Sequence, residues 1–376
     1  MITRQFPVDL SLQYSFGYDI DKIVFFDIES TGFSAETTYL YLIGCIYYKD
    51  ASFHLIQWFS EGINEEADII TSFFEFIKDY DALIHYNGSG FDIPYLNRKC
   101  SMLKLDYDFD AIDSLDIYKL ISPYKKLFKL GSFKQKSIEV FLNINREDIF
   151  DGGDLIQVYQ SYLGKKHIET LRNTRNPKAL QQTPSEADIL LHQLLLHNED
   201  DIKGLVSICP ILSYVDIFEK PIHIVQAGVD GDILTIRFEL FSNIPVRVSF
   251  GNASIYFTAL EKKAALSIHI YDGELKYFYD NYKDYYYLPA EDSAVHKSLA
   301  LFVDKEYRVK AKPSNCYTKK SGLFAPQYET LITPSYKHSY QDKLSFIEIH
   351  TDFLLKEKNL ELYVSHILSH MINLKE

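Results

Sequence analysis

The sequence predicts a mixed α/β domain followed by a mainly antiparallel β domain with a few helices, and three observations lead to this fold class. Strand-like segments at 22–28, 39–48 and 52–59 precede an alternation of strands and helices, which is typical of a mixed sheet with flanking helices. After Cys209-Pro210 the pattern changes to strand-like alternation, as in 233–241. Turn signals such as Asp230-Gly231 and Asp272-Gly273 separate these later segments. We therefore expect two domains, residues 1–212 and 213–376.

Local patterns assign the remaining elements. Lys49-Asp50 is short enough to close a hairpin between the second and third strands. Residues 65–80 carry apolar side chains at the spacing of an amphipathic helix, and 82–86 is a short buried strand. Further helices are expected at 91–102, 115–122, 132–142, 154–163 and 186–208 in the first domain, and at 291–303 and 353–373 in the second.

Composition limits the class of protein. The 376 residues have a formal net charge of −13, which argues against a chain that coats nucleic acid but not against a nuclease with a local basic patch. No run of about 18 apolar residues is present, so we expect no membrane partner. The N-terminus lacks the apolar region of a signal peptide, and four distant cysteines form no CxxC pair. A cytoplasmic location is the resulting expectation.

Two carboxylates end the first strand, in Asp27-Ile28-Glu29-Ser30-Thr31-Gly32. Side chains at i and i+2 of a strand point to the same face, so Asp27 and Glu29 are expected side by side. Such a like-charged pair is tolerated when a cation lies between the two groups. Hard divalent cations such as Mg²⁺ or Mn²⁺ prefer these oxygen ligands, so the motif predicts a metal-dependent enzyme.

A third carboxylate follows the buried strand at 82–86. In Tyr86-Asn87-Gly88-Ser89-Gly90-Phe91-Asp92, a glycine-rich turn leads into a helix that begins near Asp92. The carboxylate of Asp92 can point back to the sheet edge where Asp27 and Glu29 lie. The alternative is that Asp92 only caps its helix.

The last acidic signal lies in the helix at 186–208. His197 and Asp201 are i and i+4, so they share one helix face. The alternative is a solvated acidic turn with a surface histidine.

Together these motifs resemble the DEDD exonuclease superfamily of the ribonuclease H-like fold, and more closely its YprB-like branch. The resemblance covers about residues 20–210, and also includes Leu115-Asp-Ile-Tyr118 and Ser132-Phe-Lys-Gln-Lys-Ser-Ile-Glu139. It implies a ribonuclease H-like mixed sheet, and two Mg²⁺ or Mn²⁺ ions held by Asp27, Glu29, Asp92 and Asp201. Two such ions stabilise an in-line displacement at phosphorus. The implied activity is a 3′–5′ exonuclease that releases nucleoside 5′-monophosphates.

His197 is the candidate that orients or deprotonates the attacking water. DEDD enzymes usually carry Tyr four residues (Tyr-x-x-x-Asp), or His five residues (His-x-x-x-x-Asp), before the final Asp. Here His197 lies four residues before Asp201, at the position of the tyrosine, and this spacing is typical of the YprB-like branch. The motifs therefore support His197 as the base less strongly than they support the four carboxylates as metal ligands.

Candidate substrate contacts follow the same motifs. Thr31 and Gly32 lie where the family's backbone approaches the terminal nucleotide, although Gly32 can also serve only the turn. Asn87 and Phe91 lie in the second motif, where Asn87 either bonds substrate or holds the turn. Lys125 and Lys126 belong to a basic segment with interleaved aromatic residues, which suits a single strand but also fits a solvated helix face.

We weigh two classes of function. The first is a metal-dependent exonuclease acting on a single-stranded or frayed 3′ end of DNA or RNA. The second is a catalytically silent nucleic-acid-binding or scaffolding protein with the same fold. All four carboxylates are present, which favours the enzyme. Residues 213–376 resemble no family, and their role is open.

Overall fold

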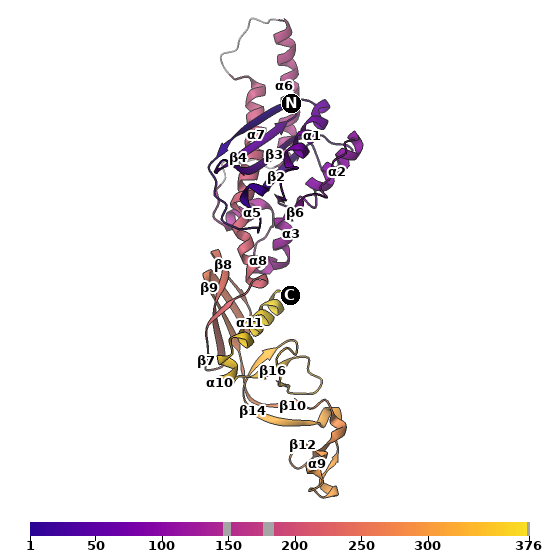
Figure 1. The fold of residues 1–376 in the computed structure, drawn as a ribbon, viewed down its shortest axis with the longest axis vertical. Helices are drawn as coiled ribbons and strands as arrows, with labels where there is room; N and C mark the ends of the chain where they lie inside the picture. The colour runs from indigo at the N-terminus through magenta and orange to yellow at the C-terminus, as the bar shows by residue number, and fades with distance from the viewer. Residues whose placement is uncertain (146–151, 176–183, 374–376) are drawn as a thin grey trace. The chain divides into compact units, whose positions relative to one another are not determined.

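The computed structural model describes residues 1–145, 152–175 and 184–373, which form two compact units (Figure 1). Unit 1 contains Met1–Lys125 and Leu130–Leu212, and unit 2 contains Lys126–Lys129 and Ser213–Glu376. Lys126 therefore packs with the second unit, whereas the sequence prediction places it with the first domain.

A six-stranded mixed sheet forms the centre of unit 1. Its order is β1(Ile2–Val8), β4(Ser52–Phe59), β3(Leu40–Lys49), β2(Ile23–Ser30), β5(Ala82–His85) and β6(Asp113–Asp116). The pairs from β1 to β2 are antiparallel, whereas β2–β5 and β5–β6 are parallel. The predicted mixed sheet with flanking helices is confirmed.

Helices cover both faces of this sheet. The helices α1(Glu66–Ile77) and α2(Asp92–Leu103) share one apolar core with alternate residues of β2, β3 and β4, including Phe26, Ile43 and Trp58. On the other face, α6(Gly152–Arg175) and α7(Glu186–Ser207) pack on β3 and β4 through Tyr41 and Phe59. Because Phe26 and Ile28 face α1 and α2, the intervening Asp27 faces α7.

One row of residues crosses four strands under α7. Asp27 pairs with Gly44, Gly44 with Gln57, and Gln57 with Arg4. Glycine in a strand interior marks a close approach of another backbone or side chain. A methyl group on Gly44 would overlap Asn198 Oδ1 and Ile202 Cδ1 of α7. The missing side chain at Gly44 thus lets α7 lie directly over the sheet.

A buried ion pair joins α1, α2 and the segment before β3. Lys99 Nζ lies 2.7 Å from Glu66 Oε1, and both side chains are almost fully buried. Lys99 also donates to the Thr38 carbonyl, and Glu66 accepts from the Leu40 N–H, each at 2.6 Å. A buried charge pair needs such additional hydrogen bonds to offset its desolvation, and here they fix α1 and α2 against the start of β3.

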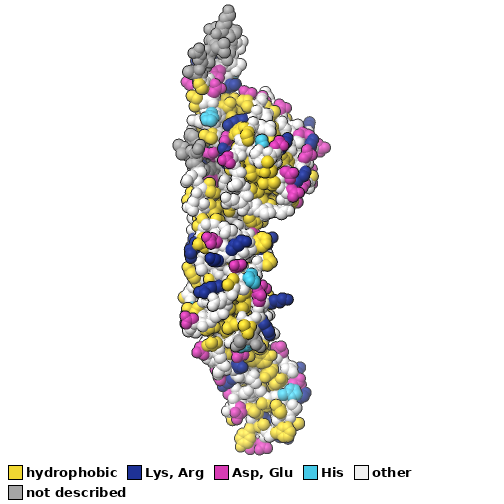
Figure 2. Space-filling view, turned by 60° about the vertical axis from the view of Figure 1, so that its left-hand side comes forward, with side chains coloured by type: hydrophobic (Ala, Val, Ile, Leu, Met, Phe, Trp, Pro, Cys, Tyr) yellow, Lys and Arg dark blue, Asp and Glu magenta, His cyan; other side chains and the backbone are white. Residues whose placement is uncertain are grey.

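Unit 2 is mainly antiparallel β structure. One sheet has the order β7(His223–Asp230), β8(Ile233–Gly251), β9(Ile255–His269). A second has the order β10(Tyr271–Phe278), β14(Tyr317–Gln327), β16(Ser345–Glu348), β15(Ser335–Tyr336), and a third the order β12(Ser293–His296), β11(Tyr285–Leu288), β13(Val309–Lys310). The principal helices are α8(Ser213–Glu219) and α11(Glu357–Asn373). In Figure 2, Lys and Arg side chains are frequent over the part that holds β7–β9 and α11.

The sequence prediction of a helix at 291–303 is wrong. Ser293–His296 is a strand that pairs with β11, and only the four residues of α9(Lys297–Ala300) are helical. Helix-forming residue types favour a helix there, but pairing with β11 overrides this local preference. The strands β1 and β6 were not foreseen, and the predicted helix at 353–373 is broken into α10(Thr351–Leu355) and α11.

Within the residues that the structure describes, no helix has both the length and the apolar character needed to cross a bilayer. The four cysteines are buried free thiols.

Replacing Gly44 with alanine tests the close approach of α7. We expect Gly44→Ala to lower the free energy of unfolding by about 1–3 kcal/mol, because the new methyl group overpacks the contact with Asn198 and Ile202. Chemical denaturation monitored by circular dichroism measures this. Gly164→Ala on α6 is the control: its added methyl meets no atom within 4 Å, so no loss is expected. Equal stability of the two variants would contradict the packing argument.

Candidate active site

The strand β2 presents two carboxylates toward α7. Asp27 and Glu29 are separated by one residue, so the pleat of the strand directs both side chains to this face. Asp27 Oδ2 accepts a hydrogen bond from Asn198 Nδ2 at 3.2 Å. Glu29 is hydrogen bonded to the buried Tyr41 on the neighbouring strand. The predicted pair therefore lies beneath α7, where each carboxylate has at least one polar partner.

The loop between β5 and α2 brings Asp92 to this pair. Asp92 is buried and begins α2, and its Oδ1 accepts from the Ile28 N–H at 3.3 Å, between Asp27 and Glu29. The loop is held by the buried Asp116, which accepts from the N–H groups of Asn87 and Ser89 at 2.9 and 3.2 Å. The carboxylate of Asp92 thus contacts the main chain of β2.

His85 supports the same loop as a neutral ring. Its Nδ1 accepts from the Gly88 N–H at 3.1 Å, and its Nε2 lies 2.8 Å from Ser114 Oγ. Burial lowers the pKa of His85 to about 4, so the ring stays neutral and Nδ1 remains an acceptor.

The helix α7 supplies the remaining groups. His197 Nε2 lies 3.2 Å from Asp201 Oδ2 and 3.7 Å from Glu29 Oε1. One ligand atom each from Glu29, His197 and Asp201 can be chosen so that all lie within 4.8 Å of one another. Residues that are about 170 positions apart in the sequence are therefore in the same site. The His197 side chain is 3% exposed, and it lies between the two carboxylates rather than on the helix surface.

Burial and mutual repulsion act on the carboxylates together. Desolvation raises the pKa of Asp27 well above its usual range, and the charges of Glu29, Asp92 and Asp201 raise it further. Desolvation likewise raises the pKa of Glu29 to about 8, with His197 opposing the shift, and the pKa of Asp92 to about 7. Such clustered acids are a functional-site signature, because a structure gains nothing from gathering like charges without a cation.

A chain of amide side chains positions Asp27, and sequence reasoning missed it. Asn198 is fully buried: it donates to Asp27, and its Oδ1 accepts from Gln57 Nε2 at 3.0 Å. Gln57 Nε2 also donates to the Leu195 carbonyl at 2.9 Å. A glutamine inside the apolar strand Ser52–Phe59 and a glycine inside Leu40–Lys49 were the available signals.

Among the predicted substrate contacts, Thr31 is already engaged. Its hydroxyl accepts from the Tyr39 N–H at 2.9 Å, so it closes the turn after β2. Gly32 has φ +155°, and its carbonyl accepts from Ser30 Oγ at 2.8 Å. These two residues shape the turn after β2, as expected if Gly32 serves the turn.

Next to this turn lies an exposed aromatic residue that sequence reasoning did not single out. The Phe33 side chain is 91% exposed, and its ring packs edge-on against Phe91 with centroids 5.8 Å apart. Phe91 in turn packs on Tyr95. An apolar ring left in solvent beside an acidic cluster offers a face on which a base can stack.

The two predicted lysines have different surroundings. Lys125 belongs to unit 1, and its ammonium lies 4.9 and 5.2 Å from the ring centroids of Tyr118 and Phe133. Lys126 belongs to unit 2. Asn87 is exposed, with a left-handed backbone at φ +61°. Within unit 1, Lys125 and Asn87 line a common cavity.

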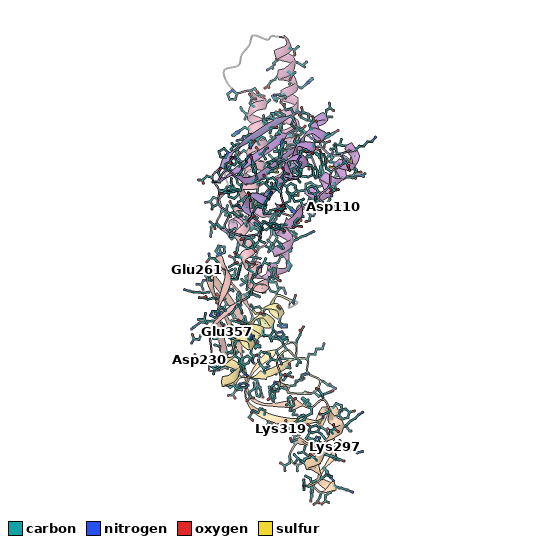
Figure 3. The ribbon with its side chains drawn as sticks, viewed as in Figure 1. Asp110, Asp230, Glu261, Lys297, Lys319 and Glu357 are labelled. Atoms are coloured by element: carbon teal, nitrogen blue, oxygen red, sulfur yellow. The ribbon has the colours of Figure 1, made fainter. Side chains whose placement is uncertain are left out.

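Two lysines of the later basic run at 305–320 have acidic partners. Within it, Lys319 pairs with Asp292 and Glu274, and Lys320 pairs with Glu348. The nearby Lys297 pairs with Asp284, and Figure 3 shows Lys297 and Lys319 in the same part of unit 2. Their charges are largely balanced by neighbouring acids.

A scan against protein families matches residues 24–213, about half of the chain, to the RNase_H superfamily. The chain belongs to the RNase H superfamily. Nucleases with this fold generally use divalent metals, and Glu29, His197 and Asp201 form a possible metal-binding group.

Two solved structures are similar to parts of this RNase H superfamily chain. One is a family B DNA polymerase from the archaeon Pyrobaculum calidifontis, with 12% identity, 70% of this chain and 35% of that chain covered, and a TM-score of 0.32. The other is an Exonuclease I from Methylocaldum szegediense, with 11% identity, coverage of 57% and 53%, and a TM-score of 0.27. The matches thus span about a third and about half of the lengths of these proteins. Among curated proteins, none matches.

The raised pKa values predict how stability depends on pH. An acid whose pKa is raised by folding destabilises the protein as pH rises from its unfolded value, about 4, through its folded value. For Asp92 and Glu29 the folded values are about 7 and 8. Without divalent cation, we expect the melting temperature to fall between about pH 5 and pH 8, and to fall less in Glu29→Gln. Differential scanning fluorimetry measures this.

Mn²⁺ should reverse the effect, because it compensates the ionised carboxylates. The melting temperature should therefore rise more with Mn²⁺ at pH 8 than at pH 5. An equal rise at both pH values, or the same rise in Glu29→Gln, would show that the ion does not bind these acids.

Proposed function

We propose that this protein is a metal-dependent 3′–5′ exonuclease that hydrolyses phosphodiester bonds at single-stranded or frayed ends of DNA or RNA. The observation that carries the proposal is that Glu29, His197 and Asp201 can each place one ligand atom within 4.8 Å of the others, with Asp27 close enough to Glu29, Asp92 and Asp201 for their charges to raise its pKa. Membership of the RNase H superfamily supports the reaction class. The 3′ polarity follows from the resemblance of the ordered motifs to DEDD exonucleases.

The donor set fits divalent cations. All four groups are carboxylates, the ligands that Mg²⁺ and Mn²⁺ prefer. Desolvation raises the pKa values of Asp27, Glu29 and Asp92, and for Asp27 and Glu29 the charges of neighbouring carboxylates add to the shift, which a cation would oppose. We assign Asp27, Glu29, Asp92 and Asp201 as the residues that would hold two ions. When bound, such ions supply Lewis-acid stabilisation of the charge that develops on phosphate oxygens.

The chain's own groups orient the reactants. His197 lies within reach of both Glu29 and Asp201, and we assign it to hold the attacking water and accept its proton at Nε2. The two flanking carboxylates stabilise the imidazolium that results. Asn198 holds the carboxylate of Asp27 in place. Phe33 and Phe91 provide an apolar surface for an unpaired base, which favours a single-stranded end.

A catalytically silent binding or scaffolding protein is the competing function. A protein that only binds nucleic acid gains nothing from four mutually repelling acids placed toward its phosphate-bearing ligand. We therefore favour the enzyme. Residues 213–376 are proposed to be an accessory domain, and the four buried thiols support a reducing, cytoplasmic location.

Substitution of the carboxylates tests the proposal. We expect Asp27→Asn and Asp201→Asn to reduce the release of 5′-mononucleotides from a labelled single strand by about a hundredfold or more with Mn²⁺, because each removes a stabilising charge from the reacting centre. Strands labelled at either end and resolved on a denaturing gel give rate and polarity.

The control is Asp110→Asn, which removes an exposed carboxylate of unit 1 outside the site (Figure 3). It should retain full activity. Degradation by Asp27→Asn at the rate of the unaltered protein would end the proposal, and shortening from the 5′ end would overturn its polarity.

A further inference from the structure

Beside the carboxylate cluster, unit 1 contains a cavity of about 740 Å³ that the proposed reaction does not use. Its walls come from the loop after β5, from α3(Ile117–Ile121), from the start of α4(Lys125–Phe128) and from the segment that leads into α5(Gln135–Phe141). The volume is in the range of small-ligand sites, and all lining residues belong to unit 1.

The cavity is joined to the active site through Gln135. Its Nε2 donates to the Asp201 carbonyl at 2.7 Å and to Glu139 Oε1 at 2.9 Å. On the opposite wall, Asn87 lies five residues before Asp92 in the same loop. The cavity is thus bounded by a residue that contacts the main chain of one proposed metal ligand, Asp201, and by a residue of the loop that leads to another, Asp92.

The cavity combines cationic and aromatic groups. The Lys125 ammonium lies over the rings of Tyr118 and Phe133 and donates to the Tyr118 hydroxyl at 3.1 Å. Tyr86 donates to the Phe133 carbonyl at 2.6 Å and so fixes that segment. Lys134 is exposed at the same wall.

Neither lysine is neutralised by the protein. In the part of the chain that the structure describes, Lys125 and Lys134 make no ion pair with a carboxylate, although the chain has a net charge of −13. Elsewhere, lysines such as Lys78, Lys99 and Lys319 are paired with acids. Two ammonium groups without an acidic partner give this wall of the cavity positive charges that can contact an anion.

We propose that this cavity binds one nucleotide unit of the substrate strand, with its phosphate on Lys125 and Lys134 and its base against the Tyr118 and Phe133 rings. Aromatic faces accept any base, so the subsite grips a single strand without reading its sequence. A duplex cannot enter, because its bases are paired and stacked on one another. The exposed amide of Asn87 at the mouth can bond a base edge or sugar hydroxyl. This subsite deepens the proposed function. Binding of the strand does not depend on the exonuclease proposal, and the subsite rests on that proposal only for the reaction that follows binding.

Fluorescence anisotropy of a labelled oligothymidylate with the full chain tests the phosphate contact and the base stacking. Ca²⁺ is present so that binding is observed apart from turnover. Lys125→Gln should weaken binding and reduce the slope of log K against log salt by about 0.7, the value for one lost contact to a single-strand phosphate. Phe133→Leu should weaken binding by about fivefold or more with an unchanged slope, because it removes only stacking.

Lys78→Gln is the matched control, since it removes the same charge from an exposed site directly after α1 and should leave affinity and slope unchanged. A slope in Lys125→Gln equal to that of Lys78→Gln overturns the phosphate contact, and unchanged affinity in Phe133→Leu overturns the stacking.

A strand with a single abasic site moved stepwise from the 3′ end locates the subsite. We expect one position within the first few nucleotides to lower affinity, and Phe133→Leu to lose this dependence while keeping its thermal midpoint. If every position binds equally to the unaltered protein, no base enters the cavity. Degradation assays on the same strands separate the two proposals: binding without degradation supports the subsite and contradicts the exonuclease, whereas degradation that ignores both variants contradicts the subsite alone.

Discussion

The close approach of α7 to the central sheet is the constraint on which the site depends. At Gly44 the strand β3 carries no side chain, so Asn198 and Ile202 of the helix lie directly over it. That contact places His197 and Asp201 next to the carboxylates at the end of β2. A larger residue at position 44 would separate the two halves of the site, because packed interiors do not absorb an extra methyl group without displacement.

The close packing of α7 on the sheet also brings carboxylates together, and their polar neighbours only partly offset the resulting repulsion. Burial raises the pKa values of Asp27, Glu29 and Asp92, and repulsion from neighbouring carboxylates adds to the shift at Asp27 and Glu29. Gln57 and Asn198 hold one carboxylate, and Asp116 holds the loop that carries another. These supports fix positions but add no positive charge. The remaining repulsion is what a divalent cation would relieve, so folding and cation binding are linked in this domain.

The sequence motifs located the acids because period and spacing are local. Alternation in a strand places Asp27 beside Glu29, and helical spacing places His197 beside Asp201. What brings these pairs together is not local. The roles of Gly44 and Gln57 depend on strand register across β2, β3 and β4, and the predicted hairpin makes β3 and β4 neighbours without specifying how they lie against β2 and α7. Thr31 is engaged in its turn for a similar reason, since its partner Tyr39 lies across the loop. The cavity at Lys125 also requires three separate segments.

The central claim is that the four carboxylates hold two cations, and anomalous scattering at the manganese edge tests it most directly. The measurement uses a crystal of the protein soaked with Mn²⁺ and a nucleoside 5′-monophosphate. The account predicts two manganese peaks among the carboxylates of Asp27, Glu29, Asp92 and Asp201, with the nucleotide phosphate against them. Peaks elsewhere on the surface, or none among these four side chains while the protein is intact, would contradict it.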